Sequence, residues 1–572
     1  MKLILKLIQS HIVLFLTGVF FLLLETIADL LQPTYMSYIV DKGVQGKDVH
    51  LILRYGAAML GIAAVGAIGA VMRNLFASYT SQTISRDLRS TLYRKVQTLS
   101  FENIDRLQPA SIITRITNDV TQIQNFINGC MRIMLRAPIL GIGSVILILA
   151  RTPEQAPLML FVLIASTLLI TANMKLGYPR FGLLQKQLDR LNTVSREFLS
   201  SIRVVKAFHA EQQEEEKFRS IAEDYASTGV AATRIAAIFS PLLNLTVNLS
   251  IVILLWRSQT QNASEIGRLM ASVNYMTQIL FALGMVSNIL NSAVRAVTSA
   301  GRVQEILEEE PVQTVPEQPQ AVLVQGAICF QEVSFRYART SRDALSGLRF
   351  SIHPGETIGI IGPTGSGKSS LVNLVPRFYD ATKGHILIDG VDITQMDPEI
   401  LRQAIAVVPQ KPLLFSGTIA ENLRWGDENA SAEQIHTAVR ISCADEFINK
   451  LPEGYETQLG QGGVNLSGGQ KQRLSLARAL VRHPRILILD DCTSALDAAT
   501  EATVLNGLRE EAADITVLLI SQRISTVMKA DRILCLEDGH MCGFGTHEEL
   551  LLHCSAYQAI YTSQIGGESH GR

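Results

Sequence analysis

Apolar residues dominate six long stretches in the first half of the chain, and a shorter-period pattern replaces them in the second half. The six stretches cover residues 12–38, 57–76, 137–150, 157–174, 235–256 and 269–294. A helix needs about 20 apolar residues to cross a bilayer, so the third and fourth stretches must extend into their amphipathic flanks. The pattern predicts six membrane-spanning helices, with soluble core helices as the alternative for the two short stretches.

Two long charged stretches separate the second apolar segment from the third and the fourth from the fifth. They hold most of the arginine and lysine residues of this half. Because basic loops stay on the cytoplasmic side, we expect both stretches and both termini inside. Few helix breakers interrupt them, which predicts cytoplasmic extensions of the membrane helices. Breaks near residues 108–115 and 200–208 are the expected places for two short transverse helices.

Three pairs of polar residues inside the predicted spans lie four residues apart and share one helical face. They are Glu25 and Asp29, Asn244 and Asn248, and Asn274 and Gln278. Polar residues within a membrane are functional candidates, which predicts a substrate cavity. The alternative is that they hydrogen bond neighbouring helices. Glu25 and Asp29 favour cationic cargo, because buried acids attract cations.

The composition changes near residue 310. Residues 311–325 are rich in proline and polar side chains, as linkers are, and from residue 326 short β-rich runs alternate with helical ones. We therefore expect a membrane domain at 1–310, a linker at 311–325 and an α/β domain at 326–572. The net charge of -1 predicts no nucleic-acid partner. The seven cysteines form no CxxC pair and predict no disulfide or metal framework.

A glycine-rich loop lies between a predicted strand at 357–361 and an apolar helical run. Its residues are Gly362, Pro363, Thr364, Gly365, Ser366, Gly367, Lys368 and Ser369, followed by Ser370. This pattern predicts a loop whose backbone N–H groups surround the phosphates of ATP. Lys368 is expected to reach the β- and γ-phosphates, and the Ser369 hydroxyl to bind Mg²⁺.

Other residues complete the predicted ATP site. Asp490 ends a second buried strand and is expected to hold the Mg²⁺ water shell. Gln410 is a further candidate ligand for Mg²⁺ or water, and Tyr337 is a candidate for stacking on adenine, although an aromatic residue at a strand end is more often core. A second glycine loop opens a helix and predicts another anion-binding end; it contains Ser467, Gly468, Gly469 and Gln470.

Together, the phosphate loop, Gln410, residues 466–470, Asp490 and residues 494–497 resemble the ATPase domain of ABC transporters. Six spans fused to this domain resemble an ABC exporter half-transporter. The resemblance implies a dimer in which two ATP molecules lie between the nucleotide-binding domains. Each ATP would contact the phosphate loop of one chain and the 467–470 loop of the other. The transverse segments would be coupling helices, the second of which inserts into the partner.

The chain departs from the family pattern at two catalytic positions. Asp491 stands where the family has a glutamate that polarises the attacking water, and Gln522 stands where it has a histidine. Before the signature loop, Gln461, Gly462 and Gly463 replace a common Glu-Arg-Gly. Misplacing a catalytic group by about 1 Å costs on the order of 100-fold in rate. The chain thus resembles the degenerate-site subunit of bacterial heterodimeric multidrug exporters.

This resemblance implies ATP-driven export of hydrophobic, amphipathic or cationic compounds across a bacterial plasma membrane. The partner would be a second half-transporter that supplies the missing glutamate and histidine. Three alternatives remain open: a lipid or peptide flippase, a homodimer with slow turnover, and a nucleotide-gated regulator or channel.

Overall fold

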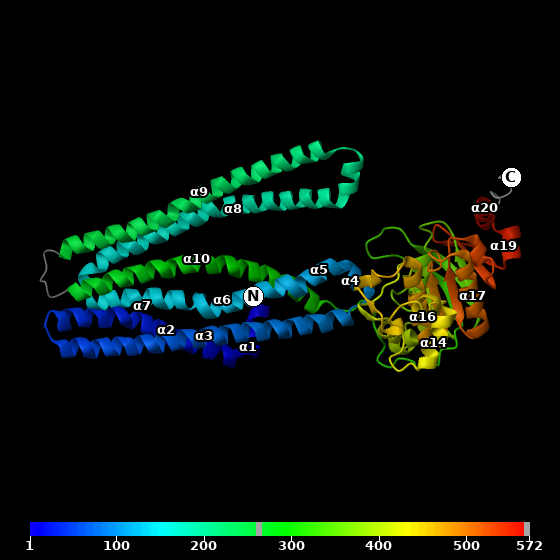
Figure 1. The fold of residues 1–572 in the computed structure, drawn as a ribbon, viewed down its shortest axis with the longest axis horizontal. Coiled ribbons are helices and arrows are strands. Elements are labelled where there is room, and N and C mark those ends of the chain that lie inside the picture. Colours follow the sequence, from blue (N-terminus) through cyan, green and yellow to red (C-terminus); the bar gives the residue numbers. More distant parts are fainter. Residues whose placement is uncertain (259–265, 566–572) are drawn as a thin grey trace. The chain divides into compact units, whose positions relative to one another are not determined.

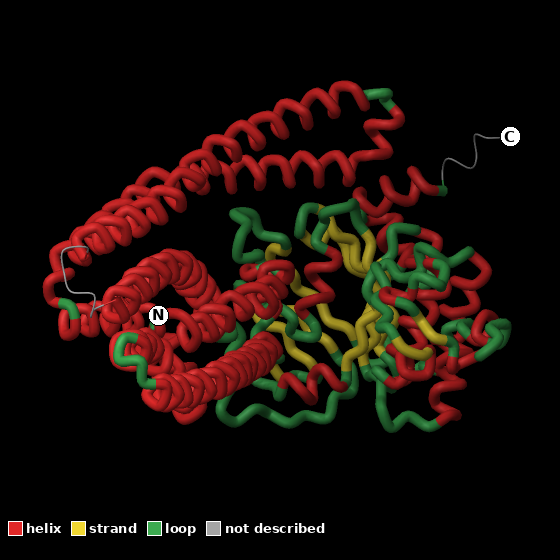
Figure 2. The backbone as a smooth tube through the Cα atoms, turned by 60° about the vertical axis from the view of Figure 1, so that its left-hand side comes forward, coloured by secondary structure: helices red, strands yellow, loops and turns green. Residues whose placement is uncertain are grey.

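The computed structural model describes residues 1–258 and 266–565, and the chain divides into two compact units. Unit 1 comprises Met1–Gln97 and Pro109–Glu308, and unit 2 comprises Thr98–Gln108 and Glu309–Arg572. Unit 1 is helical, whereas the strands gather in unit 2 (Figure 2).

Unit 1 is built from long helices joined by short connections (Figure 1). The α-helices are α1 (Lys2–Ser10), α2 (Ile12–Tyr38), α3 (Val49–Thr98), α5 (Pro109–Thr114), α6 (Val120–Gly129), α7 (Arg136–Arg151), α8 (Ala156–Ala207), α9 (Glu211–Ser258) and α10 (Ile266–Glu308). Three π-helical segments and one 3₁₀ turn connect them: η1 (Ile39–Val44), η2 (Arg115–Asp119), η3 (Cys130–Met134) and η4 (Pro153–Gln155).

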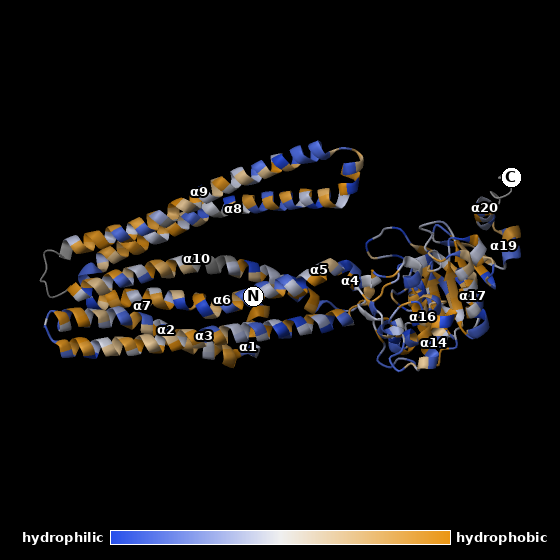
Figure 3. Cartoon of the chain, viewed as in Figure 1, coloured by the Kyte–Doolittle hydropathy of each residue, from blue (hydrophilic) through white to orange (hydrophobic). Residues whose placement is uncertain are grey.

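Five helical stretches among the described residues are long and apolar enough to cross a membrane. They are Ile12–Val44, Val49–Thr98, Pro109–Arg151, Pro153–Ala207 and Glu211–Trp256. Hydrophobic residues, coloured orange, predominate along α2 and along the left-hand part of α3 in Figure 3. The sixth expected segment, 269–294, lies in α10. The side chains of 286–291 are outside the described residues, so the count of six stays a prediction.

The two expected transverse segments differ from each other. The first, near residues 108–115, falls on the short helix α5 (Pro109–Thr114), which follows another short helix, α4 (Phe101–Leu107). Helix α4 ends at Gln108, whose φ is 63°, because Pro109 disfavours a helical residue before it and starts α5 instead. In the second, α8 continues to Ala207 and its last turns run across the rest of the helix in Figure 1.

Unit 2 has a six-stranded sheet in the order β12-β11-β3-β10-β9-β6, in which only the β11–β12 pair is antiparallel among the described strands. The strands of this sheet are β3 (Thr357–Ile361), β6 (Ile405–Val408), β9 (Ile486–Asp490), β10 (Thr516–Ile520), β11 (Arg532–Glu537) and β12 (His540–Gly545). All five residues of β10 are buried, as in parallel strands covered on both faces.

An antiparallel sheet, ordered β2-β1-β4-β5, and a two-stranded ladder, β7-β8, complete the strands described in unit 2. They are β1 (Ile328–Phe335), β2 (Leu345–Ile352), β4 (Lys383–Ile388), β5 (Val391–Asp392), β7 (Gly417–Thr418) and β8 (Gln458–Leu459). The remaining helices are α11 (Lys368–Leu374), α12 (Pro398–Gln403), α13 (Ile419–Arg424), α14 (Ala432–Ile441), α15 (Asp445–Ile448), α16 (Gly468–Val481), α17 (Ala498–Glu511), α18 (Ile524–Val527), α19 (His547–His553) and α20 (Ser555–Gln564), with 3₁₀ turns η6 (Gly454–Glu456) and η7 (Gln461–Gly463).

Candidate functional site: a nucleotide pocket

A pocket of about 390 Å³ lies where parallel strands β3, β9, β10 and β6 end. Ligands bind at the carboxyl ends of strands in open α/β sheets, because the loops that follow the strands meet there. The residues that line the pocket are Tyr337, Ala344, Thr364, Gly365, Gly367, Lys368, Ser369, Ser370, Gln410, Asp490, Asp491, Ile520 and Gln522. Residues from five separate parts of the sequence are thus brought together.

The glycine loop that follows β3 requires glycine for a steric reason. Gly367 has a φ of 96°, and a Cβ atom there would lie 2.6 Å from the carbonyl oxygen of Ala344. Lys368 is 9% exposed, and its Nζ donates to the carbonyl oxygens of Gly362 and Pro363 at 2.8 Å each. Burial lowers the pKa of Lys368, and the nearby carboxylates oppose this shift. A buried ammonium beside backbone N–H groups suits a polyphosphate.

Asp490 lies at the end of β9 and accepts a hydrogen bond from the Ser369 hydroxyl at 3.2 Å. Burial raises the pKa of the Asp490 carboxyl, and the charge of Asp491 raises it further. A divalent cation bound beside Asp490 would instead lower the pKa of this carboxyl, because the cation favours the ionised carboxylate.

Asp491 is 7% exposed, and two amides donate to the same carboxylate oxygen. Gln410 Nε2 lies 3.2 Å from Asp491 Oδ2, and Gln522 Nε2 lies 3.3 Å from it. The sequence predicted these three residues in one site but not their mutual contacts. Ser494, predicted only as part of the 494–497 motif, donates its hydroxyl to the Asp491 carbonyl at 2.8 Å.

Tyr337 borders the pocket, and its hydroxyl is 3.1 Å from the Ser370 hydroxyl. Its ring meets that of Tyr379 edge to face at 5.4 Å between centroids. The Tyr379 hydroxyl in turn donates to Asp105 of α4 at 2.6 Å. Nothing in the local sequence pattern indicated Tyr379 or Asp105.

The 467–470 loop is absent from the residues that line this pocket. It caps α16 instead: the Ser467 N–H donates to Gln470 Oε1 at 2.9 Å, and the Gln470 N–H donates to Ser467 Oγ at 3.3 Å. Ser467 and Gly468 are exposed. This second predicted anion site is therefore separate from the first within one chain.

The candidate cavity acids of unit 1 are paired with basic residues. Arg73 Nε lies 2.5 Å from Glu25 Oε2, and Arg136 lies 3.2 Å from Glu25 and 2.6 Å from Asp29. Two carboxylates thus face two guanidinium groups. The predicted preference for cations has no basis in this geometry, because the acids are already neutralised. Sequence spacing missed Arg73 and Arg136 because they lie on other helices.

The remaining cavity candidates differ in their contacts. Gln278 Nε2 donates to the Asp29 carbonyl at 3.1 Å, and Gln278 Oε1 accepts from Ser144 at 3.1 Å, so Gln278 connects three helices. Asn274 donates to the Met270 carbonyl within its own helix at 3.0 Å. Asn244 and Asn248 are exposed on α9.

A helical membrane unit joined to an α/β unit with this nucleotide pocket defines an ATP-driven membrane transporter. The chain matches the ABC transporter transmembrane region over residues 15–283 and the ABC transporter model over residues 345–494. It belongs to the ABC transporter family, as an exporter half-transporter with a C-terminal ATPase domain.

Relatives of similar length support this assignment. The chain is 40% identical to the uncharacterized ABC transporter ATP-binding protein YfiB of Bacillus subtilis, over 96% of both chains. It is 31% identical to the ATP-dependent lipid A-core flippase of Pseudomonas aeruginosa, over 90% of this chain and 86% of that protein. The solved structure of a bacterial Atm1-family ABC exporter with ATP bound matches 98% of both chains, with 26% identity and a TM-score of 0.77.

Proposed function

We propose that this chain is one half of a heterodimeric ATP-driven exporter whose own phosphate loop holds ATP in a slow site. The observation that carries this proposal is the pair Asp491 and Gln522, which contact each other in the pocket that also holds the phosphate loop and Asp490. Hydrolysis takes place mainly at a second site, to which this chain contributes its 467–470 loop. The partner supplies the phosphate loop, the glutamate and the histidine of that fast site.

The chemistry of the pocket supports strong binding with slow turnover. The Asp491 carboxylate is one methylene shorter than a glutamate and is engaged by two amides. An attacking water is activated by a well-placed carboxylate, and a shift of about 1 Å costs on the order of 100-fold. Gln522 offers a hydrogen bond but no positive charge to the γ-phosphate.

The residues at the predicted Mg²⁺ position fit this ion. Ser369, Asp490 and Gln410 offer hydroxyl, carboxylate and amide oxygens, the donor types that Mg²⁺ prefers. Asp490 and Ser369 already form a hydrogen bond. When bound, Mg²⁺ would neutralise phosphate charge, while Lys368 and the loop N–H groups orient the phosphates and Tyr337 stacks on adenine.

The exposed signature loop supports assembly with a second chain. Ser467 and Gly468 are solvent-exposed and do not line their own chain's pocket. A loop of this kind at the start of the 14-residue helix α16 presents N–H groups to an anion held by another molecule. Phe208, 79% exposed after α8, suits the proposed insertion of the second coupling helix into the partner.

We place the membrane domain at residues 1–310 with six spans, the linker at 311–325 and the nucleotide-binding domain at 326–572. The domain and both termini face the cytoplasm of a bacterial plasma membrane. This orientation is supported by the basic residues in the cytoplasmic extensions.

The proposed cargo is hydrophobic or amphipathic, because the acids at Glu25 and Asp29 are paired with arginines and offer no net negative charge. Export of a lipid is the second candidate. A charge-balanced polar cluster among apolar helices suits a lipid head group, and one relative is a lipid A-core flippase.

The test is the fate of ATP in the complex purified from native membranes. After photolabelling with 8-azido-ATP and a chase, this chain should retain triphosphate while its partner carries diphosphate. Equal loss of triphosphate from both chains would exclude a slow site.

A further inference from the structure

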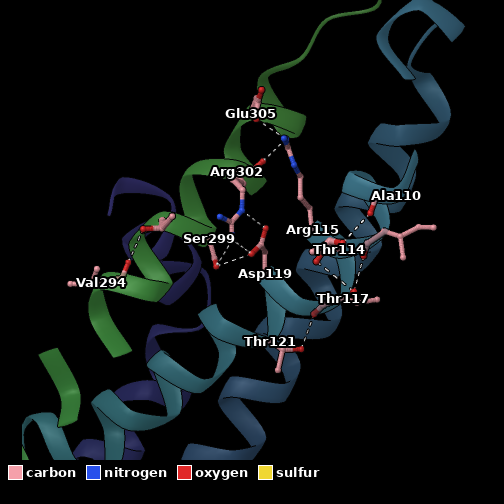
Figure 4. Close-up of polar contacts among 12 residues, drawn as sticks. Ala110, Thr114, Arg115, Thr117, Asp119, Thr121, Val294, Ser299, Arg302 and Glu305 are labelled. Atoms are coloured by element: carbon pink, nitrogen blue, oxygen red, sulfur yellow. Dashed lines mark hydrogen bonds and ion pairs between the residues drawn. The ribbon is translucent and has the colours of Figure 1, made fainter. Parts of the chain in front are cut away.

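The π-helical segment η2 (Arg115–Asp119) interrupts the helix between α5 and α6, and its two charged ends are buried. Arg115 is 9% exposed and Asp119 is 2% exposed. A π turn shifts the faces of the helix that follows it and often marks a functional position. Figure 4 shows both side chains directed at the green helix α10.

Asp119 binds α10 through three hydrogen bonds. Its Oδ1 accepts from the Ser299 hydroxyl at 2.8 Å, its Oδ2 accepts from Arg302 Nε at 2.8 Å, and Arg302 NH2 donates to Oδ1 as well (Figure 4). This bidentate guanidinium–carboxylate geometry fixes orientation as well as distance. A buried aspartate with its lone pairs satisfied in this way holds α10 in one register.

Arg115 binds the same stretch of α10 at its backbone. Its NH1 donates to the Arg302 carbonyl at 3.0 Å and lies 2.7 Å from Glu305 Oε2 (Figure 4). Arg302 is therefore held by both its side chain and its carbonyl oxygen.

A third helix binds η2 and its continuation through Arg89 of α3. Arg89 Nε donates to the Ile116 carbonyl at 3.3 Å, and Arg89 NH2 donates to the Thr121 hydroxyl at 3.0 Å. Three helices thus meet at η2. We call Arg89, Arg115, Asp119, Ser299 and Arg302 the η2 node.

The position of the η2 node along the chain relates it to the ATPase unit. Within the part of the chain that the structure describes, the backbone passes between units 1 and 2 three times, after Gln97, Gln108 and Glu308. The helix that ends at the first passage carries Arg89. The segment that begins at the second carries η2, and the helix that ends at the third carries Arg302.

We propose that the η2 node holds the three helical segments next to these passages together. ATP-driven movement of unit 2 would then move the three segments, and with them the membrane helices, as one rigid body. Asp119 and Arg302 are positioning residues for transport and touch neither ATP nor cargo. This inference rests on the proposed function, since it assumes that ATP use in unit 2 drives movement in unit 1. It goes further by naming the residues through which movement of unit 2 reaches unit 1.

The test uses Asp119→Asn and Arg302→Gln in the complex purified from native membranes. Hydrogen exchange of the α2–η1 region is compared with and without ATP and vanadate, beside ATP affinity, ATPase rate and Tm. In the variants we expect the ATP-dependent exchange change to fall about 10-fold, while ATP affinity and ATPase rate change less than about 2-fold. A merely structural role would lower Tm and all activities together.

A matched pair of hydroxyl deletions sharpens the test. Ser299→Ala removes a donor to Asp119, whereas Thr298→Ala removes the neighbouring hydroxyl, which donates only to the Val294 carbonyl in the described contacts. The first should reduce the exchange response and the second should leave it intact. A full response in Asp119→Asn would overturn the proposal. If both chains of the wild-type complex turn over ATP equally, the proposed slow site is wrong. That result is distinct from a failure of the η2 node proposal.

Discussion

Asp491 adopts a left-handed backbone conformation, with a φ of 47°, at a position where its side chain is buried. Its N–H donates to the Ile520 carbonyl at 3.0 Å, and its carbonyl accepts from Ser494 at 2.8 Å. A non-glycine residue in this left-handed conformation lowers the stability of the fold by roughly 1–3 kcal/mol, and such residues cluster at functional sites. The backbone thus fixes the Asp491 carboxylate in the pocket, at the position that we propose is catalytic in the family and one methylene too short in this chain.

Asp491→Glu alone should raise turnover in this site less than about 3-fold, because Gln522 still offers no charge to the γ-phosphate. Asp491→Glu combined with Gln522→His should raise turnover well beyond either single change. Single-turnover ATP hydrolysis, resolved by chain, measures both. Two equally fast sites after the single change would refute this account of the degeneracy.

Lys368→Ala should weaken ATP binding at this chain's site by on the order of 100-fold, because a buried cation that contacts the phosphates is lost. Part of the ATPase activity should persist through the partner's site. Nucleotide titration with photolabelling of each chain separates the two effects. Lys383→Ala, an exposed lysine on β4, is the control and should leave binding unchanged.

At the scale of elements, the loop that caps helix α16 does not line its own chain's pocket, and we propose that it acts in the partner's site. Ser467→Arg should lower the ATPase rate of the complex by on the order of 100-fold, because the fast site loses its anion-binding loop. Asp491→Ala should change that rate less than about 2-fold. Steady-state ATPase assays of the purified complex measure both, and a larger effect of Asp491→Ala would contradict the assignment.

The turn between β3 and α11 depends on glycine. Gly367→Ala should destabilise the nucleotide-binding domain by about 1–3 kcal/mol, because a Cβ is strained at a φ of 96° and collides with the Ala344 carbonyl. ATP binding should fall as well. Thermal unfolding with and without ATP measures both effects. Gly365→Ala, where φ is 85° but no atom lies within 4 Å, should be milder.

The sequence could predict that the phosphate-loop, Gln410, Asp490 and Gln522 motifs lie together, because each stands at or just after the end of a strand and parallel strands bring such loops to one edge of a sheet. Lys368, Gln410, Asp490 and Gln522 all line one pocket. The pairing of Glu25 with Arg73 was not predictable, since long-range side-chain contacts leave no trace in local spacing. The π-helical segments were not predicted either, because each spans only five or six residues and adjoins an ordinary α-helix.

At the scale of the whole molecule, the proposed function makes the complex asymmetric, because this chain would hold ATP in a slow site and contribute its 467–470 loop to the fast site. The membrane unit and the ATPase unit are connected by three passages of the backbone along the described chain. An exposed 467–470 loop in the same chain as a pocket that holds Asp491 and Gln522 supports the proposal that a second, different chain completes the fast site.

The most direct measurement is the composition of the complex that tagged chain forms in its native membranes, extracted in mild detergent and quantified by mass spectrometry. The account predicts a second half-transporter in equal amount, with glutamate and histidine at the positions of Asp491 and Gln522. Recovery of this chain alone, with full ATPase activity, would contradict it, because Asp491 would then support all of the turnover.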